Sequence, residues 1–167
     1  MELGINSISL IRNLILMTNH ISHIDLSQNP LGDNGAILLS ECFPKSTSLV
    51  HLDLSSTHIT RKGANEIFIK LSQNKSIICL LLSTSAKHIR NCFSGMAPQF
   101  LPTFLNKAEN LTFLELNSVM LGDPGLNSLY QGLEKSRSIR KLYLKNNHFT
   151  EKSAKIVLLC IDRKSVV

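Results

Sequence analysis

Apolar residues recur along this chain at a fixed spacing. One unit has apolar side chains at its first, fourth, sixth and eleventh positions, an amide at the ninth and a small residue at the fifteenth. In the first full unit these are Ile21, Ile24, Leu26, Leu31, Asn29 and Gly35. Adding 28 gives Leu49, Leu52, Leu54, Thr57, Ile59 and Gly63, and adding 28 again gives Ile77, Leu80, Leu82 and Ser85. After an interruption the pattern resumes as Leu111, Leu114, Leu116, Val119, Leu121 and Gly125, then as Ile139, Leu142, Leu144, Asn147, Phe149 and Ser153. Five copies at one period predict a solenoid of stacked units.

Each unit predicts a short strand followed by a helix. Alternation in the first half, with Ile24 and Leu26 on one side and His23 and Asp25 on the other, is typical of a strand. The second half has helical apolar spacing. The helix-facing positions are Leu39, Ile67, Leu101, Leu129 and Val157, followed by Phe43, Leu71, Leu105, Leu133 and Ile161. Asp33, Thr60, Asp123 and Thr150 are residue types that cap helix N-termini, and Pro124 suits a first helical position.

The spacing L-x-x-L-x-L-x-x-N-x-L resembles the leucine-rich repeat family. The 28-residue period and the LGDxG elements at residues 31–35 and 121–125 resemble its ribonuclease-inhibitor-like subclass. The resemblance implies an α/β fold, a curved horseshoe segment with a parallel β-sheet on the concave face and α-helices on the convex face. In that family the ninth-position Asn bonds neighbouring loops. It is kept here only as Asn29 and Asn147, so we expect less regular loops in the middle of the chain.

The repeats divide the chain into one domain of residues 1–167. It comprises a half repeat at 1–20 and repeats 1 to 5 at 21–48, 49–76, 77–110, 111–138 and 139–167. In the half repeat, turn and helix positions fall on Leu3, Ser7, Leu10, Ile11 and Leu14. A solenoid needs polar caps, and neither end resembles one. This favours a segment of a longer array over a partner that covers one end.

Repeat 3 is longer than its neighbours. It runs 34 residues, from Ile77 to Asn110, which is six more than the period. Counting from both ends places the extra residues within 83–96, in the loop that leaves the strand. Lys87, His88 and Arg90 make this loop basic, and Ile89 and Phe93 could anchor it. Either the loop contacts a partner, or it is an insertion of the kind that surface loops tolerate.

Equivalent strand residues should form columns on the concave face, because stacked strands lie about 4.8 Å apart. The third positions are His23, His51, Cys79, Phe113 and Lys141, and the fifth positions are Asp25, Asp53, Leu81, Glu115 and Tyr143. The seventh positions are Ser27, Ser55, Ser83, Asn117 and Lys145. The face thus changes from polar through apolar to basic. Apolar side chains with a charged rim are typical of a protein-binding patch, with Tyr143 its strongest candidate hot spot.

The sequence contains little that would support catalysis or cofactor binding. His23 and His51 could share a zinc ion with Asp25 and Asp53 nearby, although His and Asp pairing across strands explains them as well. Strand serines on an open face lack an oxyanion hole, and the glycines near Asp33 lack the lysine of a phosphate-binding loop. We therefore expect no enzyme, no metal, no cofactor and no small-molecule substrate.

Composition and charge refine this interpretation. The hydrophobic content of 43% suits a globular chain, and no apolar run reaches the ~18 residues of a membrane helix. Four dispersed cysteines, Cys42, Cys79, Cys92 and Cys160, indicate free thiols in a reducing compartment, hence the cytoplasm. The net charge of +6 arises entirely in residues 134–167, which hold nine Lys/Arg against three Asp/Glu. That basic end is either a solvated surface or attractive to nucleic acid, acidic lipid or an acidic protein.

The sequence thus predicts a non-catalytic module that binds another protein through its concave strand face and its strand-to-helix loops. Nucleic acid is a weaker candidate partner, and membrane insertion is not expected. Two alternatives of other classes remain open. One is a GTPase-activating regulator, since some members of the subclass, of the Ran-activating type, act on a GTPase. The other is a scaffold segment of a cytoskeletal, ciliary, innate-immune or effector assembly.

Overall fold

Strands and helices alternate along the chain as the repeats predict. The computed structural model describes residues 4–18, 20–85, 89–153, 155–156, 158 and 165–166. The helical elements are α1 (Ile5–Met17), α2 (Gly32–Ser40), α3 (Arg61–Leu71), α4 (Leu101–Lys107), α5 (Gly122–Lys135) and the 3-10 helix η1 (Glu151–Ser153). The strands are β1 (His23–Asp25), β2 (His51–Asp53), β3 (Cys79–Leu81), β4 (Phe113–Glu115), β5 (Lys141–Tyr143) and β6 (Ser165–Val166). Within these described ranges, no helix is long and apolar enough to cross a bilayer.

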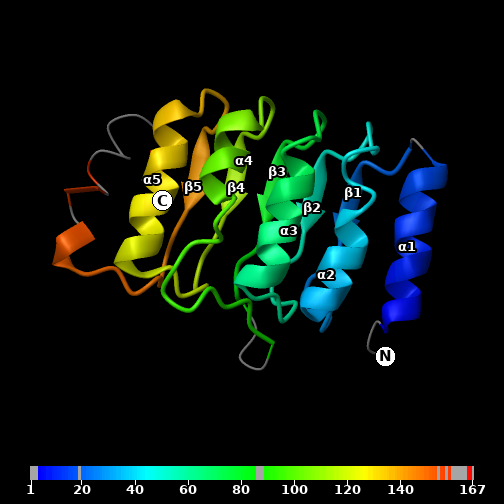
Figure 1. Cartoon of the computed structure of the whole chain (residues 1–167), viewed down its shortest axis with the longest axis horizontal. Helices are drawn as coiled ribbons and strands as arrows, with labels where there is room; N and C mark the ends of the chain where they lie inside the picture. The colour runs from blue at the N-terminus through cyan, green and yellow to red at the C-terminus, as the bar shows by residue number, and fades with distance from the viewer. Residues whose placement is uncertain are drawn as a thin grey trace.

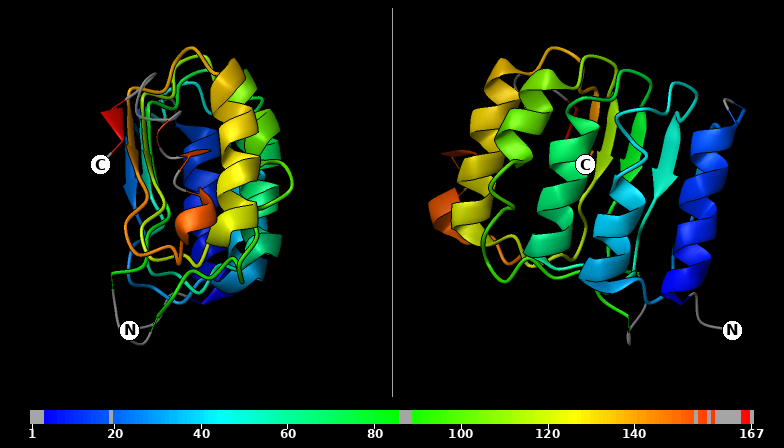
Figure 2. Two further views of the ribbon diagram at one scale, coloured as in Figure 1. Left: turned by 90° about the vertical axis from the view of Figure 1, so that its left-hand side faces the viewer. Right: turned by 45° about the vertical axis from the view of Figure 1, so that its right-hand side comes forward.

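All six strands form one parallel sheet in chain order, β1 to β6. The helices lie side by side on one face of it (Figure 1), and a view along the stack shows two layers, sheet and helices (Figure 2). This confirms the predicted α/β solenoid. The sequence did not predict β6, because Ser165 pairs with Lys141 after only 24 residues (165 − 141), short of the 28-residue period.

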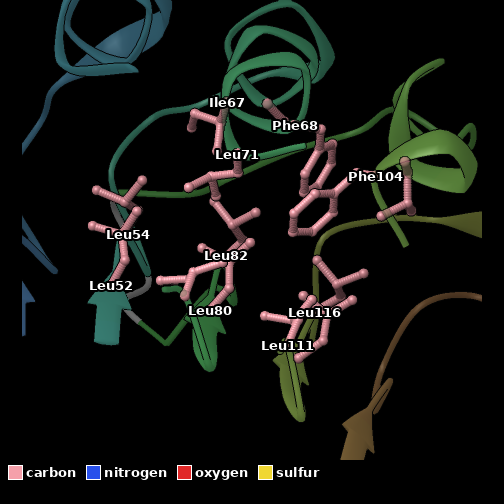
Figure 3. Packing of buried hydrophobic residues seen from close by; sticks show 14 of the residues in the cluster. Leu52, Leu54, Ile67, Phe68, Leu71, Leu80, Leu82, Phe104, Leu111 and Leu116 are labelled. Carbon is pink, nitrogen blue, oxygen red and sulfur yellow. The ribbon is translucent and has the colours of Figure 1, made fainter. Parts of the chain in front are cut away.

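The core lies between the two layers, where the predicted apolar positions meet. Leu52, Leu80 and Leu114, the middle residues of consecutive strands, are all completely buried. Figure 3 shows Leu52 and Leu80 of this core together with side chains from the helices, among them Ile67, Phe68 and Phe104. The predicted helix-facing residues of the first four repeats are all buried. Val157 and Ile161 lie outside the described residues.

The half repeat forms the predicted helix, α1, which packs against α2. The repeat frame placed Leu10 and Leu14 at helix positions but did not tell which side of the helix is buried. Ile8 and Ile15 are 1% and 2% exposed, whereas Leu10 and Leu14 are 66% and 53% exposed. The helix carries apolar residues on two sides, and only the side toward α2 is buried, so spacing alone did not identify it. Leu3 lies outside the described residues.

Asp33 and Asp123 join repeats rather than cap their own helices. The residues before α2 and α5 are Leu31 and Leu121, and neither helix has a side-chain cap. Asp33 accepts hydrogen bonds from the Thr60 N–H and hydroxyl, at 2.8 and 2.6 Å, and from the Gly63 N–H at 3.0 Å. A Cβ on Gly63 would lie 2.6 Å from that carboxylate, which explains the glycine. The predicted Thr60 cap is present, since its hydroxyl accepts from the Lys62 N–H.

The ninth-position Asn of repeat 3 is Asn91, and the sequence assignment of Ser85 to that position was wrong. The Asn91 Oδ1 accepts from the Thr57 and Ile59 N–H groups, and its Nδ2 donates to the Leu54 and Leu82 carbonyls. Asn147 bonds repeats 4 and 5 in the same way. The middle loops are therefore more regular than we expected.

The position of Asn91 narrows the range of residues in which the insertion can lie. The Thr84 N–H bonds the Asn117 carbonyl of the next repeat, as the Ser56 N–H bonds Ser83, so Thr84 still holds the eighth position. Its hydroxyl donates to the Asn91 carbonyl at 2.9 Å and closes the base of the loop. The six extra residues are therefore 85–90, which lie within the predicted segment 83–96.

Candidate functional site

The strand register aligns the predicted site residues in two columns on the sheet face that points away from the helices, here called the inner face. His23, His51, Cys79, Phe113 and Lys141 are successive register partners, as are Asp25, Asp53, Leu81, Glu115 and Tyr143. The residues between them on each strand are the buried leucines and Ile24. Because successive strand residues point to opposite faces, the two columns must point away from the core.

The β1–β2 end of the inner face is polar, and its side chains contact one another or nearby backbone groups. The rings of His23 and His51 stack with their centroids 5.5 Å apart. Asp25 and Asp53 each accept a hydrogen bond from the backbone N–H two residues later, at 2.8 Å. Hydrogen bonds from the Ser27 hydroxyl and N–H hold the pKa of Asp25 below its usual value. Among the described residues, no group of three or more His, Cys, Asp or Glu side chains could hold a metal ion.

Cys79 and Leu81 on β3 make the centre of the inner face apolar, and both are half-buried. Burial raises the pKa of the Cys79 thiol to about 11, and the nearby Asp53 and Glu115 carboxylates add to that rise. The thiolate is the nucleophilic form of cysteine. A thiol held protonated at neutral pH is poorly suited to nucleophilic chemistry.

The β4–β5 end of the inner face combines aromatic rings with lysines. Phe113 and Tyr143 are half-buried, and their ring centroids lie 5.1 Å apart at a tilt of 34°. Lys141 and Lys145 are exposed on either side of Tyr143 along the chain. The Glu115 carboxylate, the acid that the described strand residues of these two repeats place on this face, accepts from the Ser83 hydroxyl at 2.9 Å and the Asn117 amide at 3.0 Å.

A solvent-open groove of about 330 Å³ lies along the strand-to-helix loops of repeats 3 to 5. Its lining begins one residue beyond the seventh position, with Thr84, Ser118 and Asn146, and continues at the tenth, with Cys92, Met120 and His148. The sulfur atoms of Cys92 and Met120 are 3.5 Å apart. Arg90 from the insertion also lines the groove.

Sequence reasoning missed this groove apart from Arg90. The signal was present, because Met120 and His148 are separated by the same 28 residues as the structural positions. The sequence prediction considered columns at the third, fifth and seventh positions only. The tenth positions form a further column of side chains along the loops. Of the predicted loop residues, Arg90 is exposed at the groove, and Lys87 and His88 lie outside the described residues.

Known proteins resemble this chain in both sequence and fold. The leucine-rich repeat family model matches residues 19–40 and 45–68. The chain is 28% identical to the Rho GTPase-activating protein gacW of Dictyostelium discoideum, over 85% of this chain and 13% of that protein. It is 26% identical to NACHT, LRR and PYD domains-containing protein 9 of Bos taurus, over 97% of this chain and 18% of that protein. The chain thus spans less than a fifth of the length of these relatives.

A solved structure shares the fold. The leiomodin-1 actin-binding site 2 superposes with a TM-score of 0.73, covering 96% of this chain and 89% of that one, at 17% sequence identity. Repeats of this fold generally serve as non-catalytic interaction modules. The periodic leucines, the parallel sheet backed by helices and the matching family model together show that the chain folds as an α/β leucine-rich repeat solenoid.

Proposed function

We propose that this chain is a non-catalytic module that binds another protein through its inner face and strand-to-helix loops. The binding centre is the Phe113–Tyr143 pair, with Cys79 and Leu81 beside it on the preceding strand. The polar β1–β2 end, with His23, His51, Asp25 and Asp53, contributes less. We also propose that this work takes place in the cytoplasm, because dispersed free thiols suit a reducing compartment.

One observation carries the proposal, namely two half-buried aromatic rings in contact on an otherwise open sheet face. Aromatic side chains are enriched at interface hot spots because they bury a large area with few rotatable bonds. A solenoid fold does not require aromatic residues at these positions, since His, Cys and Lys occupy the column of Phe113 in other repeats, and Asp, Leu and Glu occupy the column of Tyr143. Partner recognition explains the rings better than folding does.

The test compares two double variants in affinity capture with the native full-length protein. Phe113→Ala with Tyr143→Ala should lower the yield of captured partner about tenfold or more. His23→Ala with His51→Ala is the matched control, because it also removes a stacked ring pair from the inner face. The control should keep most of the yield. Equal capture by both variants, with unchanged far-UV circular dichroism, would exclude the aromatic pair as the binding centre.

A second candidate role is favoured by the likeness to a Rho GTPase-activating protein and to proteins that contain a NACHT domain. In this role the repeats would recruit or regulate from within a larger GTPase-regulating or innate-immune protein. Purified chain added to a GTPase with and without its activator would distinguish regulation from simple binding. A change in hydrolysis rate that depends on Tyr143 would support it.

A further inference from the structure

The inner face and the loop groove join where repeats 4 and 5 leave their strands. Asn117 and Lys145, at the seventh positions, end the inner face, and the next residues, Ser118 and Asn146, begin the groove. The two surfaces are further linked because the Lys145 N–H donates to the Asn117 Oδ1 at 2.7 Å. A partner segment that crosses the aromatic pair therefore meets the groove within a few residues.

Positive charge lines this path, and Glu115, the acid that the described strand residues place on it, accepts two hydrogen bonds. Lys141 and Lys145 flank Tyr143, and Arg90 lies in the groove beyond them. The Glu115 Oε1 accepts hydrogen bonds from the Ser83 hydroxyl and the Asn117 amide, which hold this carboxylate against the seventh-position side chains. Among the described residues, the two ion pairs are Arg12–Glu41 and Lys75–Glu109, so neither inner-face lysine is in one.

We propose that the partner presents an acidic, extended segment with an apolar anchor residue, bound along this path. The anchor packs on Phe113 and Tyr143, and carboxylates before and after it meet Lys141 and Lys145. The segment continues past Lys145 into the groove, where the Asn146 amide supplies a further donor and Arg90 adds positive charge. This inference rests on the proposed function and deepens it by naming the chemistry of the partner.

An acidic peptide fits this path better than a nucleic acid does. A nucleic acid needs several lysines or arginines at phosphate spacing, whereas here two lysines stand on either side of an apolar centre. The rings of Phe113 and Tyr143 also lie against each other, half-buried, rather than projecting separately as platforms on which successive bases stack. An apolar contact with charges at its rim is the pattern of protein interfaces.

The experiment selects ligands from random sequences, so the partner itself need not be identified first. A phage-displayed library of random dodecapeptides is panned against the full chain, and the selected peptides are synthesised with a fluorescent label. Affinity is measured by anisotropy for the wild type, for Lys141→Glu with Lys145→Glu, and for Phe113→Ala with Tyr143→Ala. Lys45→Glu with Lys62→Glu is the matched control, because both lysines are exposed away from the inner face and the net charge changes equally.

We expect peptides with one aromatic or aliphatic residue among Asp and Glu. The Lys141/Lys145 variant should bind them about tenfold or more weakly, and the control should change by less than about twofold. Higher salt should weaken binding. Peptides without acidic bias that still require Phe113 and Tyr143 would overturn this inference and leave the proposed function standing.

The remaining outcomes are also decisive. Peptides that ignore both double variants would overturn the inference and the proposed function together. Failure to select any inner-face peptide would count against the acidic segment. Labelled single-stranded RNA and DNA are measured in parallel, and tighter binding of either, lost in Lys141→Glu with Lys145→Glu, would assign the lysines to nucleic acid instead.

Discussion

The two faces of the sheet follow different rules, although they are built from the same short strands. On the face toward the helices, the middle residue of each strand from β2 to β5 is a leucine, and all four are completely buried. On the inner face, the neighbouring column runs through His, Cys, Phe and Lys. Identical packing in every repeat demands identical side chains, whereas the inner face has no such constraint. Variation within a repeat pattern therefore indicates where function is placed.

The sharpest test of this contrast uses two adjacent leucines on β3. Leu80 is completely buried among leucines of neighbouring strands, and Leu81 is half-buried on the inner face. Leu80→Ala should lower the free energy of unfolding by about 3–4 kcal/mol, because it leaves a cavity in a packed core. Leu81→Ala should cost less than about 1 kcal/mol. Urea unfolding of both variants measures the difference, and similar costs would show that the inner face also stabilises the fold.

The ninth-position amides offer the next largest effect. Asn91 is buried and bonds two repeats at once, whereas Asn29 is half-buried and donates only to the Leu26 and Ser27 carbonyls of its own turn. Asn91→Ala should lower the free energy of unfolding by about 2–3 kcal/mol, since it leaves buried backbone groups of repeats 2 and 3 without partners. Asn29→Ala should cost about 1 kcal/mol. If urea titrations gave equal losses of unfolding free energy for the two variants, hydrogen bonds between repeats would add no stability beyond those within a turn.

Asn91 also shows which features of the fold can be predicted from the sequence. The period, the strand positions and the buried leucines were predictable because each is fixed by local alternation and repeated identically. Ser85 was misassigned because counting forward from Ile77 ignores an insertion. Counting back from Leu111 would have found Asn91 and Phe93 in the same relation as Asn147 and Phe149.

The roles of Asp33 and Asp123 were less accessible from the sequence. An Asp near a helix start has two available uses, its own helix or the next repeat. Only the positions of Thr60 and Gly63 in space decide between them. The inner-face columns were predictable for the same reason as the core, whereas the groove depends on how three loops lie together.

Thiol labelling distinguishes the two faces without any mutation. Cys42 is completely buried and Cys79 is half-buried on the inner face, and burial raises the pKa values of their thiols to about 12 and about 11, respectively. Iodoacetamide should modify Cys79 slowly at neutral pH, with the rate rising about tenfold per pH unit because the thiolate is the reactive form. Cys42 should stay unmodified until the chain unfolds. Peptide mapping by mass spectrometry assigns each site, and rapid labelling of Cys42 in the folded protein would contradict its burial.

The smallest expected effect compares two aspartates whose pKa values are lowered for different reasons. Hydrogen bonds from Ser153 and Thr150 of the next repeat lower the pKa of Asp123, and bonds from Ser27 within its own turn lower that of Asp25. A carboxyl group whose pKa is lower in the folded state contributes stability above its unfolded value, here 3.8, and loses it as the pH falls through the folded value. Asp123→Asn should therefore lower the Tm slightly at pH 7, with the difference from the wild type closing below about pH 3.8. Asp25→Asn should follow the same pH course with a smaller difference, because the Asp25 carboxylate accepts its hydrogen bonds within its own turn.

Thermal unfolding from pH 7 to pH 2.5 measures the Tm of both variants. A Tm difference for Asp123→Asn that stays constant to pH 2.5 would show that contact geometry, and not the charge, couples repeats 4 and 5.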